Sequence, residues 1–158
     1  MAESVITDAM RAAVGVDGPP SVSEVTTSGI RLFARAVGHT DLAFYDEDVA
    51  HGRGYSGLLA PPGFLGTPLY RPGRRDRDAE GAGPQIDSPY KRILNGGTTY
   101  EYFAPIIAGD VITSRSRITE FREREGSIGP MLITYRETVY TRQDGTMVAK
   151  MRGNIINY

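Results

Sequence analysis

Six residues between positions 39 and 51 could take part in acid–base chemistry. The six residues are His39, Thr40, Asp41, Tyr45, Asp46 and His51, and they include both histidines of the chain. His39 and Asp41 are two positions apart and Tyr45 follows closely, so an imidazole, a carboxylate and a phenol could meet in one acid–base site. These three are the candidate catalytic residues. A histidine that follows a helix more often only complements the helix dipole, and that alternative stays open for His39.

The other chemistry-bearing residues have simpler interpretations. Asp46-Glu47-Asp48 is more typical of a helix start than of a carboxylate site. His51 is expected at the surface, with a role at a dimer seam as the alternative. Two histidines twelve positions apart make a poor metal site, and the chain has no cysteine. It also lacks a nucleophile elbow, a P-loop and a dinucleotide fingerprint. We therefore expect no metal and no cofactor.

The bulk composition describes an ordinary globular protein. The chain has 158 residues, 40% of them hydrophobic, and a net charge of -1. This length suits one domain spanning residues 1–158. The near-neutral charge gives no reason to expect nucleic acid or an anionic membrane as a partner. No apolar run is long enough for a membrane helix, and the absence of cysteine fits a reducing compartment, so we expect a cytoplasmic protein.

Several short helices are expected in the first half of the chain. The spacing over residues 4–14 predicts a helix within an N-terminal extension, residues 1–20, that packs on this domain or on a partner. Residues 21–26 alternate like a short strand. Ser28 is the expected N-cap of the next helix, which ends at Gly38. Its buried face is predicted to carry four apolar residues: Ile30, Phe33, Ala34 and Val37.

The remaining elements divide the chain into a helical and a stranded half. Pro61-Pro62-Gly63 could open another helix, short or kinked because of Pro68. Residues 71–89 are expected to form a long polar loop, either a solvated insertion or a lid or nucleotide-binding loop. From residue 92 onward the pattern predicts four antiparallel strands, with Asp144-Gly145 as a hairpin turn. Helices followed by antiparallel strands indicate an α+β fold.

Two groups of side chains on these strands have alternative interpretations. The aromatic residues Tyr100, Tyr102 and Phe103 are expected in the core or in a dimer interface. The arginines of the second long strand are most simply a solvated sheet face, although one or two could meet the diphosphate of coenzyme A: Arg115, Arg117, Arg122 and Arg124.

Two blocks of sequence, ARAVGHTDLAFYDEDVA…YSGLLAPPGFL and YFAPIIAGDVI, resemble the MaoC-like dehydratases. These are the hot-dog fold (R)-specific enoyl-CoA hydratases and 3-hydroxyacyl-ACP dehydratases, and the chain is most similar to their N-terminal MaoC-like dehydratase domain. The resemblance covers about residues 21–158. It implies an antiparallel sheet wrapped round a central helix, assembly as a double hot dog, and an acyl-CoA or acyl-ACP thioester bound at the seam.

The chain departs from this family where the family's chemistry resides. The family pattern is Gly-Asp-x-Asn-Pro-hydrophobic-His, in which Asp and His polarise the reacting water. Laid on this chain, Gly38 matches the glycine, but His39 replaces the Asp, Asp41 the Asn, Leu42 the Pro and Phe44 the His. A phenyl ring cannot carry a proton, so the Asp/His pair is lost.

A second departure concerns the backbone N–H with which the family holds the thioester carbonyl. An ungapped alignment puts Pro62, which has no N–H, at that position, whereas a shift by one residue puts Gly63 there. The resemblance thus implies substrate-binding positions on both sides of this turn: Leu42, Phe44, Tyr45, Pro62, Gly63 and Phe64.

The sequence leaves three hypotheses. The preferred one is a non-catalytic, acyl-binding subunit of a heteromeric enoyl-CoA hydratase or 3-hydroxyacyl thioester dehydratase, whose hot-dog partner carries the Asp/His pair. The second is a self-sufficient homodimeric hydratase or thioesterase that uses His39 and Asp41. The third is a non-enzymatic acyl-thioester binding protein.

Overall fold

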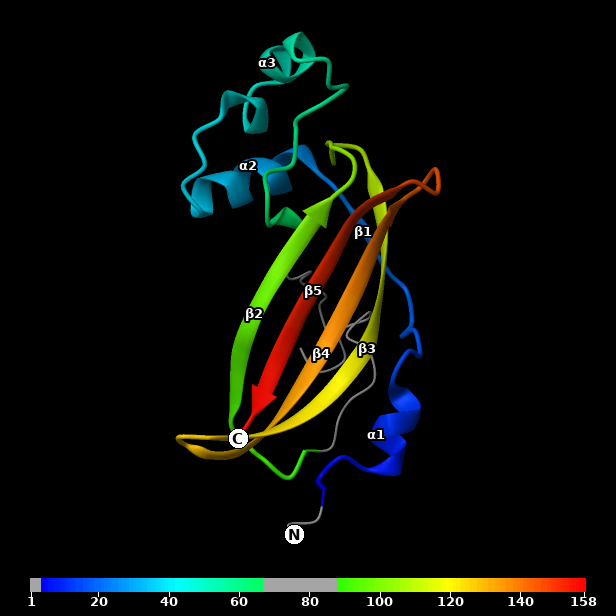
Figure 1. Cartoon of the computed structure of the whole chain (residues 1–158). Coiled ribbons are helices and arrows are strands. Elements are labelled where there is room, and N and C mark those ends of the chain that lie inside the picture. Colours follow the sequence, from blue (N-terminus) through cyan, green and yellow to red (C-terminus); the bar gives the residue numbers. More distant parts are fainter. Residues whose placement is uncertain (1–3, 67–87) are drawn as a thin grey trace, which may run out of the picture.

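The centre of the molecule is one antiparallel sheet. The structure, a computed structural model, describes residues 4–66 and 88–158 (Figure 1). Five strands are ordered β1-β3-β4-β5-β2. Their bounds are β1 Ser21–Glu24, β2 Ile93–Tyr102, β3 Val111–Gly126, β4 Gly129–Arg142 and β5 Met147–Asn157. This confirms the α+β class and the antiparallel strands predicted after residue 92.

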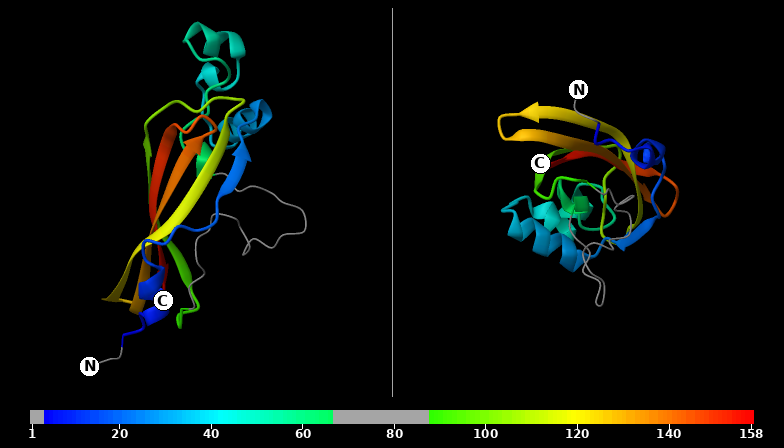
Figure 2. Two further views of the ribbon diagram at one scale, coloured as in Figure 1. Left: turned by 90° about the vertical axis from the view of Figure 1, so that its right-hand side faces the viewer. Right: turned by 90° about the horizontal axis from the view of Figure 1, so that it is seen from below.

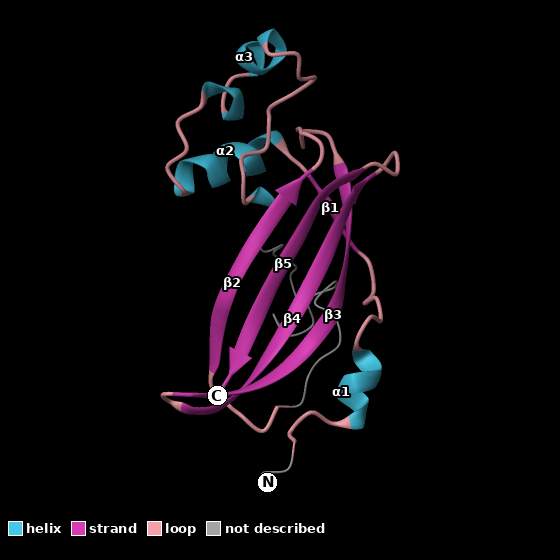
Figure 3. Ribbon diagram, in the orientation of Figure 1, coloured by secondary structure: helices cyan, strands magenta, loops and turns pink. Residues whose placement is uncertain are grey.

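Short helices lie at both ends of the sheet (Figure 3). Helices α2 (Thr27–Ala36) and α3 (Glu47–Gly52) lie at one end, and α1 (Asp8–Ala13) lies at the other. Two 3-10 turns, Leu42–Phe44 and Phe64–Gly66, complete the described helical part. Of the predicted helix after Pro61 only this second turn is described. Most of the predicted polar loop 71–89 also lies outside the described residues. No helix in the described ranges is long and apolar enough to span a membrane.

Helix α2 begins earlier than the sequence predicted. The Thr26 side chain accepts a hydrogen bond from the Gly29 N–H at 3.1 Å, so Thr26 is the N-cap and Ser28 lies inside the first turn. The prediction of Ser28 was therefore wrong, because several hydroxyl residues in a row offer the same capping chemistry. Gly38 adopts a φ of 76°, as a helix stop requires.

The buried face of α2 is also narrower than predicted. Ile30 and Ala34 are completely buried, as expected, and Phe33 is half-buried. The prediction of a buried Val37 was wrong, because its side chain is 53% exposed. Val37 is the C-cap residue, where the backbone leaves the helical periodicity that placed it on the apolar face.

The sheet is curved, and the helical part from α2 to the turn at Phe64 lies on its concave side (Figure 2). Ile30 and Ala34 of α2, Leu58 of the following loop, and Ile112 and Tyr140 of the sheet belong to one buried cluster. Packing of the amphipathic helix against this concave face supplies the core that holds the loop from residue 38 to residue 66 in place.

The two edges of the sheet differ. The N-terminal segment runs along β3, where the Gly15 and Gly18 N–H groups each donate to a β3 carbonyl at 2.8 Å, and β1 continues along the same edge. The opposite edge is β2, in which every residue except Tyr100 is exposed. Within the described residues, no strand pairs with the outer side of β2.

The N-terminal helix packs on this domain, one of the two alternatives left open by the sequence. A single carboxylate oxygen of Glu123 on β3 accepts hydrogen bonds from the Ser4 hydroxyl and from the N–H groups of Val5 and Ile6, at 2.8, 2.6 and 3.1 Å. These hydrogen bonds hold the pKa of the exposed Glu123 carboxyl below its usual range. The bond from Ser4 has the largest effect, and those from the two N–H groups add to it.

We expect Glu123→Ala to release residues 4–6 from β3, because three donors lose their common acceptor. Amide hydrogen exchange at Val5 and Ile6 should become several-fold faster, whereas Glu125→Ala on the same strand should leave it unchanged. Because the pKa of Glu123 is lowered on folding, its contribution is present above the ordinary glutamate range and is lost as the pH falls through the lowered value. Equal exchange in both variants would refute this anchor.

Candidate functional site

The loop from Gly38 to Tyr45 holds the three candidate catalytic residues, but their side chains do not bond to one another. The Tyr45 hydroxyl donates to the backbone carbonyl of His39 at 2.6 Å. The half-buried His39 ring lies edge-on to the Phe44 ring, with centroids 5.5 Å apart. Within the described part of the chain, no hydrogen bond or ion pair connects the His39 ring to Asp41.

Asp41 has other partners. Its carboxylate accepts from the Ala43 N–H at 2.9 Å, which caps the 3-10 turn, and lies 2.8 Å from the Arg53 guanidinium. The bond from Arg53, followed by that from Ala43, lowers the pKa of Asp41. An ionised carboxylate that is held in this way is suited to fixing the loop on α3 and poorly suited to donating a proton.

The apolar residues between these groups have different surroundings. Phe44 is only 7% exposed and belongs to the buried core cluster, whereas Leu42 is 59% exposed. Tyr45 is half-buried against the same core. Of the three proposed acyl-lining positions in this loop, Leu42 is therefore the one with an open side chain, and Phe44 is taken up by packing.

The Pro61–Phe64 turn faces strand β2. Pro61 is completely buried and Pro62 is exposed. Gly63 adopts a φ of 87°, and its N–H donates to the Tyr102 hydroxyl at 2.8 Å. The Phe64 ring meets the Phe33 ring of α2 edge-on, with centroids 5.8 Å apart. The turn thus combines one directed N–H group with an aromatic pair.

Tyr102 was missed as a partner of this turn by the sequence analysis. It stacks on Tyr100 at 5.9 Å, and Tyr100 lies 6.4 Å from Tyr140 on the same face of the sheet. Burial raises the pKa of Tyr140 strongly and that of Tyr100 less, so both phenols stay protonated. The spacing of Tyr100 and Tyr102 could have indicated a shared face, but not the contact with Gly63.

The remaining candidates have structural positions. The Asp46 side chain accepts from the N–H groups of Asp48 and Val49 and caps α3, as predicted. His51 is exposed at the end of that helix. In residues 4–66 and 88–158, no group of three histidine, aspartate or glutamate residues is arranged to hold a metal ion.

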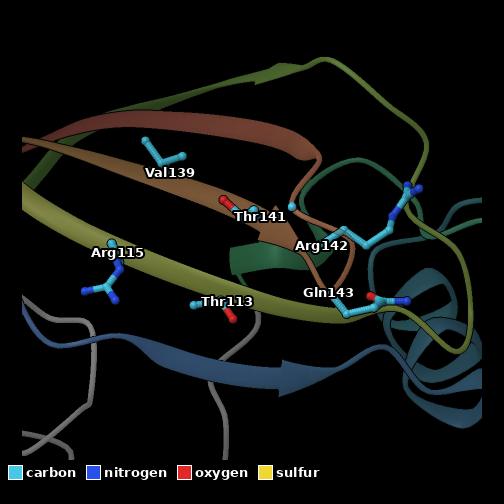
Figure 4. A pocket seen from close by; sticks show the side chains of 7 residues that line it. Thr113, Arg115, Val139, Thr141, Arg142 and Gln143 are labelled. Atoms are coloured by element: carbon cyan, nitrogen blue, oxygen red, sulfur yellow. The ribbon is translucent and has the colours of Figure 1, made fainter.

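The face of the sheet opposite the tyrosines carries a separate pocket of about 320 Å³ (Figure 4). It is lined by residues of β3, β4 and the β4–β5 hairpin: Thr113, Arg115, Val139, Thr141, Arg142, Gln143 and Gly145. Arg142 in this pocket pairs with Asp110, and the neighbouring Arg117 pairs with Glu137. Side chains alternate between faces along a strand, so this pocket is distinct from the site around Gly63.

Comparison with known proteins identifies the family. The model of the FAS1-like dehydratase domain region matches residues 12–151. The chain belongs to this family. A UPF0336 protein of Streptomyces griseus is 35% identical over 116 residues, which cover 72% of this chain and 74% of the relative. A UPF0336 protein of Parafrankia is 30% identical over 127 residues, 80% of this chain and 79% of the relative.

Solved structures place this dehydratase domain among the hot-dog folds. A chain of the Mycobacterium tuberculosis HadBC (3R-hydroxyacyl-ACP dehydratase) complex matches with a TM-score of 0.70 and 23% identity, over 92% of this chain and 97% of its own length. A MaoC-like dehydratase matches with a TM-score of 0.75 and 24% identity, over 93% of this chain and 42% of its own. A chain of the M. tuberculosis ChsH1–ChsH2 complex matches with a TM-score of 0.71 and 16% identity, over 90% of this chain and 84% of its own length. The predicted hot-dog fold is confirmed.

Substitutions of Phe44 and Leu42 should have different effects on the stability of the protein. Phe44→Ala should destabilise the protein by about 3–5 kcal/mol, because a buried aromatic side chain leaves a cavity. Leu42→Ala should change the free energy of unfolding by less than about 0.5 kcal/mol, because its side chain is exposed. Urea denaturation of both variants measures the difference. A small effect at Phe44 would mean that its ring lines an open channel.

Proposed function

We propose that this chain is the non-catalytic, acyl-binding subunit of a heteromeric (R)-specific enoyl-CoA hydratase or 3-hydroxyacyl thioester dehydratase. The observation that carries the proposal is Phe44, which stands where the resemblance expects the catalytic histidine and is 7% exposed within the core. His39 stands in place of the catalytic Asp, and Asp41 is paired with Arg53. The chain leaves proton transfer to a partner subunit that carries the Asp/His pair.

The open edge of β2 supports a partner. An exposed edge of ten residues is a template for strand pairing, and proteins usually cover or interrupt such edges. It is followed by Phe103, which is 47% exposed, and begins with Ile93, which is 67% exposed. The similar HadBC and ChsH1–ChsH2 structures are themselves complexes. A second hot-dog subunit that pairs along β2 would extend the sheet and complete a double hot dog.

The purified chain should not hydrate an enoyl-CoA by itself, because residues 4–66 and 88–158 hold no positioned acid–base pair. Addition of a hot-dog partner with an intact Asp/His pair should restore hydration, followed as loss of the enoyl absorbance. His39→Ala in this chain should leave the rate of the complex within about twofold.

Two outcomes contradict the proposal. Hydration by the chain alone at an ordinary enzymatic rate, abolished by His39→Ala, would establish a self-sufficient enzyme that uses His39 and Asp41. Absence of hydration activity with every partner, together with tight binding of acyl thioesters, would establish a binding protein.

The same partner should bind more weakly when a positive charge is placed beside the β2 edge. Phe103→Lys places an ammonium group on the proposed interface, and loss of an aromatic contact there should weaken association by roughly tenfold or more. Val22→Lys on β1 is the matched control, because Val22 is 50% exposed at the opposite edge of the sheet. Analytical ultracentrifugation measures both. Equal weakening, or none, would place the interface elsewhere.

A further inference from the structure

The turn before Phe64 offers a single directed hydrogen-bond donor. Pro61 and Pro62 have no N–H, the Ala60 N–H donates to the Ile106 carbonyl at 2.7 Å, and the Phe64 N–H donates to the Pro61 carbonyl at 3.1 Å. The Gly63 N–H alone leaves the backbone network of this turn, and it donates to the Tyr102 hydroxyl. The backbone donor is therefore already used within the chain.

The Tyr102 hydroxyl can in turn donate its own proton. A phenol oxygen that accepts a hydrogen bond still has its own proton to donate, and acceptance strengthens that donor. Among the described residues, the hydrogen bond from Gly63 is the one that involves the Tyr102 hydroxyl, and its proton has no acceptor there. The side chain is 41% exposed, so a ligand atom can reach it.

The surroundings of this hydroxyl fit a carbonyl with an apolar chain. Tyr102 is the last residue of the open edge strand β2. On one side its ring stacks on Tyr100, and beyond Gly63 lies the Phe33–Phe64 pair, with the Phe33 ring 3.4 Å from where a Gly63 Cβ would be. One neutral donor beside aromatic surface matches the carbonyl oxygen and acyl chain of a thioester.

We infer that Tyr102 is a substrate-binding residue: its O–H donates to the carbonyl oxygen of the bound acyl thioester, and the Gly63 N–H holds its oxygen in place. The inference rests on the proposed function, because it assumes that this chain binds the acyl thioester. It assigns the carbonyl contact to a side chain of the edge strand rather than to the backbone of the turn.

The test compares Tyr102→Phe with Tyr100→Phe in the complex with the partner subunit. Each variant removes one hydroxyl from the same aromatic stack, but the Tyr100 hydroxyl is associated with Tyr140 instead of Gly63. The probes are a saturated acyl-CoA and the matching S-alkyl-CoA thioether, which lacks the carbonyl oxygen. Calorimetry should show roughly three- to tenfold weaker binding of the thioester to Tyr102→Phe, the loss expected for one hydrogen bond. Thioether binding, and both affinities of Tyr100→Phe, should stay within about twofold.

Three other results would overturn the inference. Equal weakening of thioester and thioether would mean that Tyr102 only shapes the site. Unchanged or tighter thioester binding by Tyr102→Phe would mean that the Gly63 N–H is the carbonyl donor and that Tyr102 covers it. In both cases the wild-type complex still binds and the proposed function stands. Failure of the wild-type complex to bind the thioester would refute the proposed function itself, and this inference with it.

Discussion

The structure depends on an asymmetry between the two edges of one sheet. Every strand edge presents backbone N–H and C=O groups that must find partners. The chain uses its own N-terminal segment on the β3 edge, where Gly15 and Gly18 donate to β3 and Glu123 fixes residues 4–6. It leaves β2 uncovered among the described residues, with nearly every side chain of that strand exposed. The two edges of the sheet therefore differ in whether the chain itself covers them.

The candidate site lies beside the open edge of the sheet. Strand β2 ends in Tyr102, whose hydroxyl accepts a hydrogen bond from Gly63, and on the same face of the sheet Tyr100 packs towards Tyr140. A ligand near this hydroxyl would lie beside the edge at which a partner subunit would pair. Substrate binding and assembly would then share one strand, and this fits an acyl-binding subunit that lacks its own acid–base pair.

The loop that resembles a catalytic stretch makes several structural contacts. Phe44 adds an aromatic side chain to the core, and Asp41 anchors a 3-10 turn and pairs with Arg53. The Tyr45 hydroxyl holds the carbonyl of His39. These contacts stabilise the loop by engaging the Asp41 carboxylate and the Tyr45 hydroxyl, whereas the His39 ring meets the Phe44 ring.

The sequence by itself determined the features that depend on near neighbours. Alternation along β3 placed Arg115 and Arg117 opposite Ile112 and Ile118, and Asp46 capped α3, because both patterns act over a few residues. The family motifs also predicted the hot-dog fold. The sequence did not determine the cap of α2, because Thr26 and Ser28 offer the same capping group at neighbouring positions.

Only the tertiary structure decided what the site consists of. The contact between Gly63 and Tyr102 joins residues 39 positions apart, and the pairing of Asp41 with Arg53 requires α3 to fold back on its loop. The contact between Gly63 and Tyr102 depends on the register of β2 against β5 and on the packing of α2 against the concave face. A sequence pattern records which side chains share a face, whereas the distance between two faces is set by how all the elements pack together.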